Sequence, residues 1–163
     1  VGVVGPAGGI VFYDKGAYSD GWRYLEAAPA STEGETKPWG GYETEVGEAA
    51  EGFAIGTGAA NTQAIVAEYA DNEPDADRVD YAAKLAADLV HGGYGDWFLP
   101  SKDELKEMYE NLHVEGLGGS ASAYYWSSSE HNAGSARVQY LQTGLQRLYN
   151  KRAETSVRAV RSF

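Results

Sequence analysis

The chain has 163 residues, of which 43% are hydrophobic, 21 are glycine and none is cysteine, and its formal net charge is −11. A chain of this length and composition can bury the core of one ordered domain, and the lack of cysteine excludes disulfides, thiolate metal sites and a cysteine nucleophile. The acidic charge disfavours nucleic acid and anionic membrane surfaces as partners, and no stretch is long and apolar enough to span a membrane.

The first third of the chain predicts a hairpin followed by a long excursion. Residues 8–14 are rich in β-branched and aromatic side chains, as is typical of a strand. The Asp-Gly pair at 20–21 favours a hairpin turn, and residues 22–27 alternate large apolar with polar side chains. Residues 30–52 are polar, acidic and glycine-rich, with Trp39 as their large apolar anchor, so we expect a surface excursion.

Two or three helices are predicted in the middle of the chain. Asn61 is expected to cap the first one, which would bury Ile65, Val66 and Tyr69. Residues 71–77 are expected to form a loop.

Asp77 is expected to cap the next helix. Three apolar residues there follow helical spacing, namely Leu85, Leu89 and Val90. Gly92 occupies the position at which a glycine ends many helices. The expected helix therefore runs from Asp77 to the glycine pair at 92–93.

Residues 92–105 link that helix to the following one. The apolar run at 97–99 is too short for a helix and predicts a buried crossing, with Trp97 in the core, and Pro100 favours an extended residue before it. Ser101 and Glu104 match a capping box, in which each side chain bonds a backbone donor of the new helix. The buried stripe of that helix is expected to be Leu105, Met108, Tyr109 and Leu112.

The C-terminal third predicts strands. Residues 124–130 form the first of them, and residues 136–141 and 144–150 are expected to pair as a hairpin. Residues 156–163 alternate, which predicts a closing strand.

In that closing strand, Val157, Ala159 and either Val160 or Phe163 would face the core. Arg158 and Arg161 would then face solvent. Strands at both ends with helices between them predict an α+β domain. We expect the first and last strands to pair and to bring the termini together.

Three segments together carry a resemblance. They are residues 5–13 (Gly-Pro-Ala-Gly-Gly-Ile-Val-Phe-Tyr), residues 93–105 (Gly-Tyr-Gly-Asp-Trp-Phe-Leu-Pro-Ser and the Glu-Leu pair), and the motifs at 125–130 and 157–161. In this order they resemble the C-terminal domain family of bacterial collagen-like adhesins, which has a C-type-lectin-like fold. They also resemble the variable proteins of diversity-generating retroelements, which share that fold.

The resemblance implies that residues 1–163 form a single C-type-lectin-like domain. Its terminal strands would be paired, and its β-rich C-terminal half would bind the ligand. The abrupt opening at Val1 suggests the C-terminal part of a longer protein. An extracellular, cell-surface or virion-surface location is implied, with a protein ligand or cell-surface receptor as the partner.

In the variable proteins, a stretch before the final Val-Arg strand is rewritten by adenine-directed mutagenesis, and here it would be about 131–155. Eight side chains in it are of types reachable from an asparagine codon by adenine changes, and apolar residues between 145 and 149 lack clean alternation. Exposed Tyr, Arg and Leu are typical of contact surfaces. We therefore expect the ligand to contact Arg137, Tyr140, Thr143, Leu145, Arg147, Leu148, Tyr149 and Arg152, and replacement there to leave folding intact.

The alternative function is a glycan-binding adhesin domain that recognises sulfated polysaccharide, as the collagen-like relatives imply. Sulfate binding requires clustered cations. The overall acidic charge argues against it, although four cations could form a local basic patch. These cations are Arg137, Arg147, Lys151 and Arg152.

An enzyme is not expected. The serines at 127–129 and His131 could form a nucleophile and base, but no nucleophile elbow is present, and hydroxyls that bond backbone are the better interpretation. Formylglycine-generating enzymes share the fold but need cysteines. No catalytic residue and no cofactor is therefore assigned.

No metal or nucleotide site is expected either. The three histidines lack the sequence spacing of metal ligands. They are His91, His113 and His131. The Gly-Thr-Gly at 56–58 lacks the third glycine of a dinucleotide loop. The Glu-Pro-Asp at 73–75 is interpreted as a solvated loop, and the acidic residues between 43 and 51 as a solubilising face.

Overall fold

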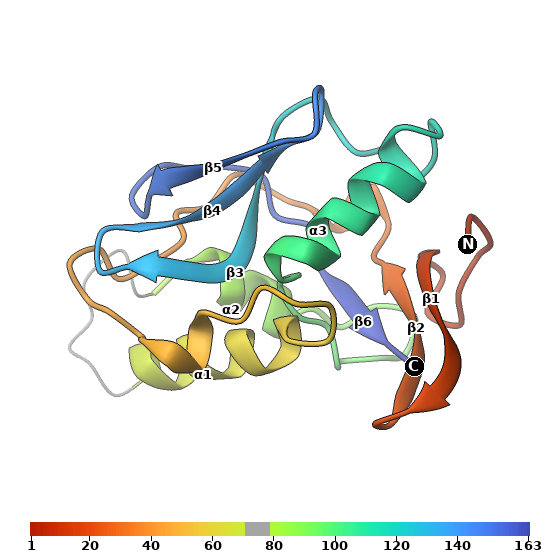
Figure 1. Cartoon of the computed structure of the whole chain (residues 1–163), viewed down its shortest axis with the longest axis horizontal. Coiled ribbons are helices and arrows are strands. Elements are labelled where there is room, and N and C mark those ends of the chain that lie inside the picture. Colours follow the sequence, from red (N-terminus) through yellow and green to blue (C-terminus); the bar gives the residue numbers. More distant parts are fainter. Residues whose placement is uncertain (71–78) are drawn as a thin grey trace.

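The computed structural model describes residues 1–70 and 79–163 and shows a mixed α+β arrangement in them (Figure 1). One antiparallel sheet has the order β1-β2-β6 and consists of β1 (Ile10–Ser19), β2 (Trp22–Ala27) and β6 (Val160–Ser162). The other has the order β3-β4-β5 and consists of β3 (Tyr124–Asn132), β4 (Ser135–Tyr140) and β5 (Leu145–Asn150). The α-helices in the described part are α1 (Gly58–Ala70), α2 (Ala82–Ala87) and α3 (Lys102–Met108). The predicted α+β class is thus confirmed.

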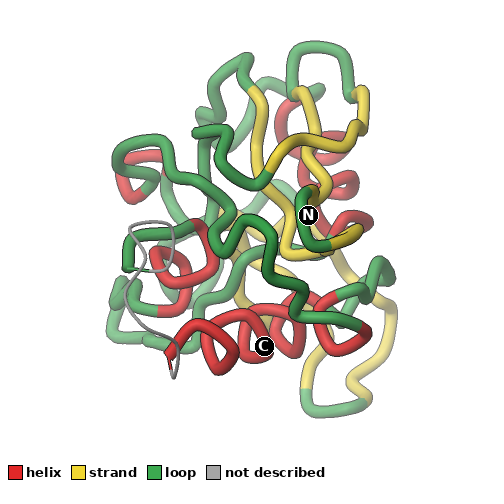
Figure 2. The backbone as a smooth tube through the Cα atoms, turned by 90° about the vertical axis from the view of Figure 1, so that its left-hand side faces the viewer, coloured by secondary structure: helices red, strands yellow, loops and turns green. Residues whose placement is uncertain are grey.

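Short helical turns and long loops complete the backbone. Two of the turns are 3-10 helices, η1 (Ala30–Thr32) and η2 (Glu48–Ala50), and one is a π-helical turn, η4 (Tyr109–His113), that continues α3. Figure 2 shows how much of the chain is loop. The two sheets lie at opposite ends of Figure 1, with α3 between them, so the helices and loops carry the core from one sheet to the other.

The first sheet closes in a different order from the one expected. The hairpin turn at 20–21 is confirmed, but β6 pairs with β2 and not with β1. The reason lies at the N-terminus, where the Gly2 amide donates to Val11 and the Val11 amide donates to Val3. These residues cover the outer edge of β1, so β2 offers the free edge. The expectation that the first and last strands pair is therefore wrong, although both termini lie at this sheet (Figure 1).

The crossing at 97–99 is buried, as the sequence predicts. The Phe98 amide donates to the Val160 carbonyl at 2.8 Å, and the Val160 amide donates back at 2.9 Å, which places β6 between β2 and the crossing. The capping box is also confirmed, since the Ser101 Oγ accepts from the Glu104 amide and the Glu104 carboxylate accepts from the Ser101 amide. Of the predicted stripe, Tyr109 is half-buried and three residues are fully buried, namely Leu105, Met108 and Leu112.

Two helix boundaries differ from the prediction. Helix α1 begins at Gly58, so Asn61 lies inside it and does not cap it. The buried Asn61 amide instead donates to the Gly52 carbonyl at 2.7 Å and to the Ser128 hydroxyl at 3.2 Å. Helix α2 ends at Ala87, and Gly92 belongs to a tight turn in which residues 91 and 94 exchange backbone hydrogen bonds. The predicted loop at 71–77, the Asp77 cap and the acidic motif at 73–75 lie outside the described residues.

The excursion at 30–52 is attached more firmly than expected. Trp39 is buried, and its indole nitrogen donates to the Ser127 carbonyl at 2.9 Å. Further along, the Val46 and Gly47 amides donate to the Glu130 carboxylate. Glutamates at 43, 45 and 48 remain exposed, as a solubilising face requires. The excursion thus packs on β3 and keeps its acidic side chains outside.

The two arginines of the closing segment are buried, which corrects the prediction that they face solvent. Arg158 is 1% exposed and Arg161 is 3% exposed. Buried charges are tolerated when their polar atoms have partners. The predicted burial of Val157, Ala159 and Val160 is confirmed.

Arg158 joins three separate segments. Its Nε donates to the Ala28 carbonyl at 2.5 Å, its Nη2 donates to the Gly118 carbonyl at 2.5 Å, and its Nη1 lies 2.5 Å from the Glu33 carboxylate. The Tyr125 hydroxyl also donates to Glu33, at 3.0 Å. Arg158 therefore supplies hydrogen-bond donors to backbone carbonyls that hydrophobic packing alone would leave unpaired.

Within residues 1–70 and 79–163, no helix combines the length and the apolar character needed to cross a membrane.

Replacing Arg158 with methionine should lower the free energy of unfolding by about 3–5 kcal/mol, because it leaves the Ala28 and Gly118 carbonyls without this donor and removes the cation paired with Glu33. Urea denaturation measures the loss. The exposed Arg147, replaced in the same way, serves as the control and should change stability by less than about 0.5 kcal/mol. Equal effects of the two substitutions would contradict the role of Arg158.

Candidate binding surface on the β4–β5 hairpin

The hairpin that carries most of the predicted ligand contacts is regular. Strands β4 and β5 pair without a shift from Ser135 opposite Asn150 to Tyr140 opposite Leu145. Because successive side chains of a strand point to opposite sides, this register divides the hairpin into two faces. Figure 1 shows the hairpin at the end of the molecule far from both termini.

The turn of the hairpin is fixed against the helix. Gly144 has a φ of +75°, and a Cβ at this position would lie 2.4 Å from the Tyr109 ring of η4. The Gly144 amide donates to the Tyr140 carbonyl at 2.8 Å, which closes the turn. Both the positive φ and the close approach require glycine, so this residue positions the tip of the hairpin.

One face of the hairpin gathers aromatic side chains. The Tyr124 ring of β3 stacks on Tyr140, with centroids 4.5 Å apart and an angle of 21°, and lies 4.7 Å from the Tyr149 ring. The register places Leu145 and Arg147 on the same side. We call these five residues, Tyr124, Tyr140, Leu145, Arg147 and Tyr149, the tyrosine face.

The tyrosine face is partly exposed and partly continuous with the core. Leu145 is 43% exposed, whereas the Tyr149 ring packs edge-on against the buried Trp126, with centroids 6.4 Å apart. Hydrogen bonding with Tyr124 raises the pKa of the Tyr149 hydroxyl above its usual value of 10.0. Tyr149 therefore presents a neutral hydroxyl at physiological pH on a ring that packs against the core.

The opposite face of the hairpin packs on the start of α3. The Gln146 amide donates to the Lys102 carbonyl and to the Gln139 side chain, each at 3.0 Å. On the same side, the Arg137 guanidinium lies 4.5 Å from the centre of the Phe53 ring. Leu148, opposite Arg137 in the register, is 44% exposed.

The eight predicted contact residues thus do not form one surface. Four belong to the tyrosine face, namely Tyr140, Leu145, Arg147 and Tyr149. Arg137 and Leu148 lie on the opposite face, and Thr143 lies in the turn. Arg152 follows β5, with its guanidinium 4.3 Å from the Tyr42 ring.

Sequence reasoning missed Tyr124 as a member of this surface. A usable signal was present, because Tyr124 precedes the buried Trp126 by two residues in a predicted strand and so shares its side. The missed neighbours Tyr42 and Phe53 come from loops, where no periodicity marks them.

The predicted basic patch does not form. Lys151 is fully buried, and its ammonium donates to the Glu130 carboxylate at 2.5 Å and to the Thr44 carbonyl at 2.8 Å. Burial lowers the pKa of Lys151, while the Glu130 carboxylate opposes that shift. Since Arg137 and Arg147 point to opposite faces, the four cations are dispersed.

The serine triplet of β3 serves the fold. The Ser127 hydroxyl donates to the Arg137 carbonyl at 2.9 Å and the Ser129 hydroxyl donates to the Gly52 carbonyl at 2.7 Å. All three serines are buried, whereas His131 is exposed. The interpretation of these hydroxyls as backbone partners is confirmed for Ser127 and Ser129, whereas the Ser128 hydroxyl accepts from the Asn61 side chain. In the described part of the chain, no three histidine, aspartate or glutamate side chains are grouped to hold a metal ion.

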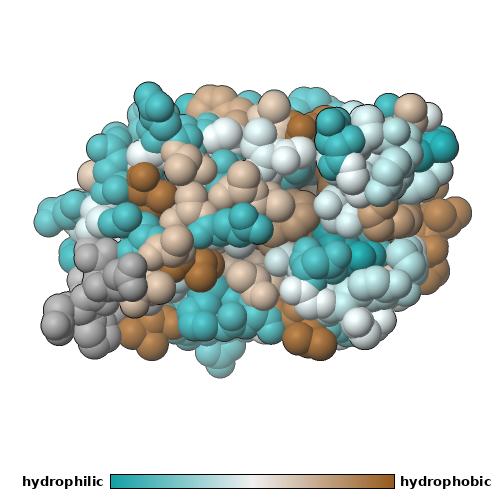
Figure 3. All heavy atoms as spheres, turned by 90° about the horizontal axis from the view of Figure 1, so that it is seen from below, coloured by the Kyte–Doolittle hydropathy of each residue, from teal (hydrophilic) through white to brown (hydrophobic). Residues whose placement is uncertain are grey.

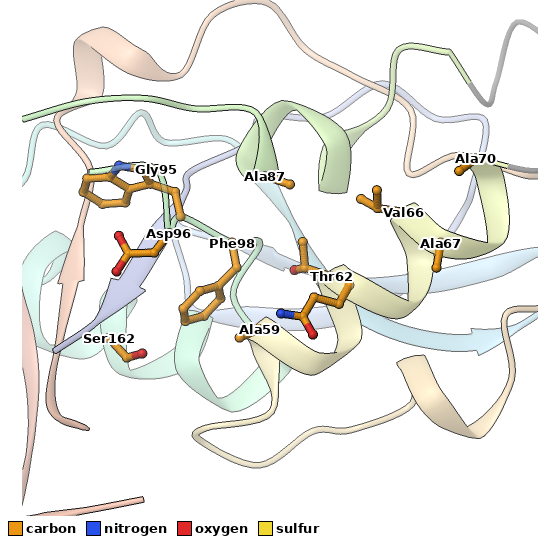
Figure 4. Close-up of a pocket in the computed structure, with 12 residues that line it drawn as sticks. Ala59, Thr62, Val66, Ala67, Ala70, Ala87, Gly95, Asp96, Phe98 and Ser162 are labelled. Carbon is orange, nitrogen blue, oxygen red and sulfur yellow. The ribbon is translucent and has the colours of Figure 1, made fainter. Parts of the chain in front are cut away.

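A groove of about 550 Å³ lies elsewhere, between α1 and the crossing (Figure 4). Small apolar side chains form much of its wall, including Ala59, Val66, Ala67 and Ala70, and apolar atoms also gather on the face of the molecule seen in Figure 3. Asp96 supplies a charge at its rim, but both of its oxygens accept from Arg161. Among the described residues that line the groove, apolar contact is therefore available but no charged group is left to orient a ligand.

No protein-family model matches this chain, and no curated protein matches it.

Substitutions in the tyrosine face should lower the free energy of unfolding by different amounts at different positions. Tyr149→Ser should lower the free energy of unfolding by about 1–2 kcal/mol, because it removes two aromatic contacts. Leu145→Ser should change it by less than about 0.5 kcal/mol. Urea denaturation of both variants tests the division, and a large loss for Leu145→Ser would show that this residue belongs to the core.

Proposed function

We propose that this chain is a ligand-binding module of the C-type-lectin-like fold, for receptor recognition or adhesion, and that the tyrosine face contacts a protein ligand. The observation that carries the proposal is the stacked group of Tyr124, Tyr140 and Tyr149 beside exposed Leu145 and Arg147. Aromatic residues and arginine are enriched among the residues that dominate binding energy.

The fold assignment is supported by contacts among the segments that carry the resemblance. The loop at 5–9 donates two amides to the Glu26 carboxylate. Glu26 lies 3.5 Å from Arg161, which in turn bonds Asp96. Segments at the start, middle and end of the chain thus meet at one point. Such contacts are expected if these residues together specify the fold.

The tyrosine face is suited to binding because its rings are already ordered. Tyr140 stacks on Tyr124, and Tyr149 packs on Tyr124 and Trp126. Few rotamers are then lost when a ligand binds, which preserves affinity. Leu145 and Arg147 extend the surface with one apolar and one cationic contact.

The arrangement also supports a diversified surface within 131–155. Positions 140, 143, 145 and 147 project from the hairpin or its turn without fixing its place. Gln146, Gly144 and Lys151 do fix it, through Lys102, Tyr109 and Glu130. Variation restricted to the first group would change the ligand and keep the scaffold. An extracellular, cell-surface or virion-surface location follows from the same proposal.

The alternative of sulfated polysaccharide is not favoured. Sulfate recognition uses clustered guanidinium and ammonium groups, but Arg147 is the cation of the tyrosine face, and Lys151 is buried in an ion pair. We propose neither a catalytic role nor a cofactor.

The double variant Leu145→Ser, Arg147→Ser should bind the natural ligand at least about tenfold more weakly, since each hot-spot residue commonly contributes about 2 kcal/mol, and should keep its melting temperature. The measurement is surface plasmon resonance against immobilised extracellular receptor domains and sulfated glycans. The control is the pair Gln63→Ser, Lys84→Ser on α1 and α2, away from the hairpin. Unchanged binding by the double variant would place the site elsewhere.

Diversification is tested separately by sequencing the DNA beside the gene. A near-identical template repeat and a reverse-transcriptase gene are expected there. Their absence would remove diversification from the proposal and leave the binding surface to be judged by the double variant.

A further inference from the structure

Phe53 lies close to two cations on the face of the hairpin opposite the tyrosine face. The Arg137 guanidinium is 4.5 Å from the centre of its ring, and the Lys102 ammonium is 5.7 Å from it. Phe53 is 38% exposed. Its loop, the start of α3 and β4 are far apart in the sequence, so the fold assembles this group from three segments.

Arg137 has hydrogen-bonding capacity that the protein does not use. Its Nε is shielded from solvent and has no hydrogen-bond partner, and among the described residues it forms no ion pair. Arg158 and Arg161 differ, because both bond carboxylates. A shielded donor without a partner is costly. The Phe53 ring holds the guanidinium in place, and the two terminal nitrogens, unlike the shielded Nε, remain available as donors.

The surroundings of Arg137 combine an exposed leucine with the ion pair of Lys102 and Asp103. Leu148, opposite Arg137 in the register, is exposed and adds an aliphatic surface next to the guanidinium. Lys102 is held by Asp103, whose carboxylate is 3.1 Å from its ammonium. The Asp103 charge disfavours a dianion here and leaves a monoanion as the better fit.

We propose that Phe53, Lys102, Arg137 and Leu148 form a binding site for a carboxylate attached to an apolar group, which we call the Phe53 site. A planar carboxylate matches the fork of donors on a guanidinium and accepts two parallel hydrogen bonds from it. The apolar group of the ligand would lie against Phe53 and Leu148. The site is separate from the tyrosine face and does not depend on the function proposed for that face.

Titration of the whole chain with benzoate, followed by two-dimensional NMR of backbone amides and arginine side chains, tests the site. Benzoate should shift the Arg137 Nε signal and the Phe53 and Lys102 amides saturably. Benzamide, which has the same shape without the charge, should not. Benzoate affinity should fall by about tenfold or more in Arg137→Gln, because the charge-assisted pair is lost. Arg147→Gln, on the other face, is the matched control and should bind benzoate like the unchanged protein.

The Arg137→Lys variant distinguishes loss of the site from misfolding, because it keeps the charge and removes only the bidentate fork. It should also weaken benzoate binding. N-acetylphenylalanine separates the two sources of such a ligand. Tighter binding than benzoate would assign the site to a peptide carboxyl terminus, and weaker binding to a small free aromatic acid. Equal binding of benzoate and benzamide, equal loss in Arg137→Gln and Arg147→Gln, or no saturable shift with either acid would overturn the proposal.

Discussion

The contact of the buried Arg161 with two carboxylates, one buried and one partly exposed, is the interaction on which the rest of this fold depends. Its Nε and Nη2 bond Asp96 at 2.8 and 2.9 Å, and Nη1 lies 3.5 Å from Glu26. Glu26 in turn accepts amides from the loop at 5–9, where a Cβ on Gly5 would lie 2.3 Å from its carboxylate. Removing one partner from a buried group of charges is strongly destabilising. The N-terminal loop, the crossing and the last strand are therefore held in one arrangement.

This arrangement separates folding from recognition. The hairpin is fixed from its inner face, where Gln146 bonds Lys102 and Gly144 closes on Tyr109. On the other side, Tyr149 packs on the core through Trp126, whereas Leu145 and Arg147 are exposed and free of these contacts. Exposed side chains of this kind can change at little cost to stability. The same separation leaves the Phe53 site on its own face.

The sequence predicted the elements whose signals are local. The turn at 20–21, the apolar run at 97–99 and the Ser101 to Glu104 capping box each depend on neighbouring residues, and all are present. The burial of Arg158 and Arg161 could not be read in this way, because their partners lie 40 to 135 residues away. The eight predicted contact residues divide between the two faces of the hairpin for a similar reason. The face that a residue of β4 or β5 occupies depends on the strand register, which is set by the partner strand.

The pairing of β6 between β2 and the crossing also bears on the order of folding during synthesis. Glu26 and Asp96 leave the ribosome long before Arg161, so each carboxylate remains solvated until residues 160–162 emerge. Chains begin to fold as they are made, N-terminal parts first, but here the first sheet and the crossing cannot lock together until this late segment arrives. The domain therefore stays partly open until residues 160–162 are made, and its apolar segments remain in contact with solvent for that time.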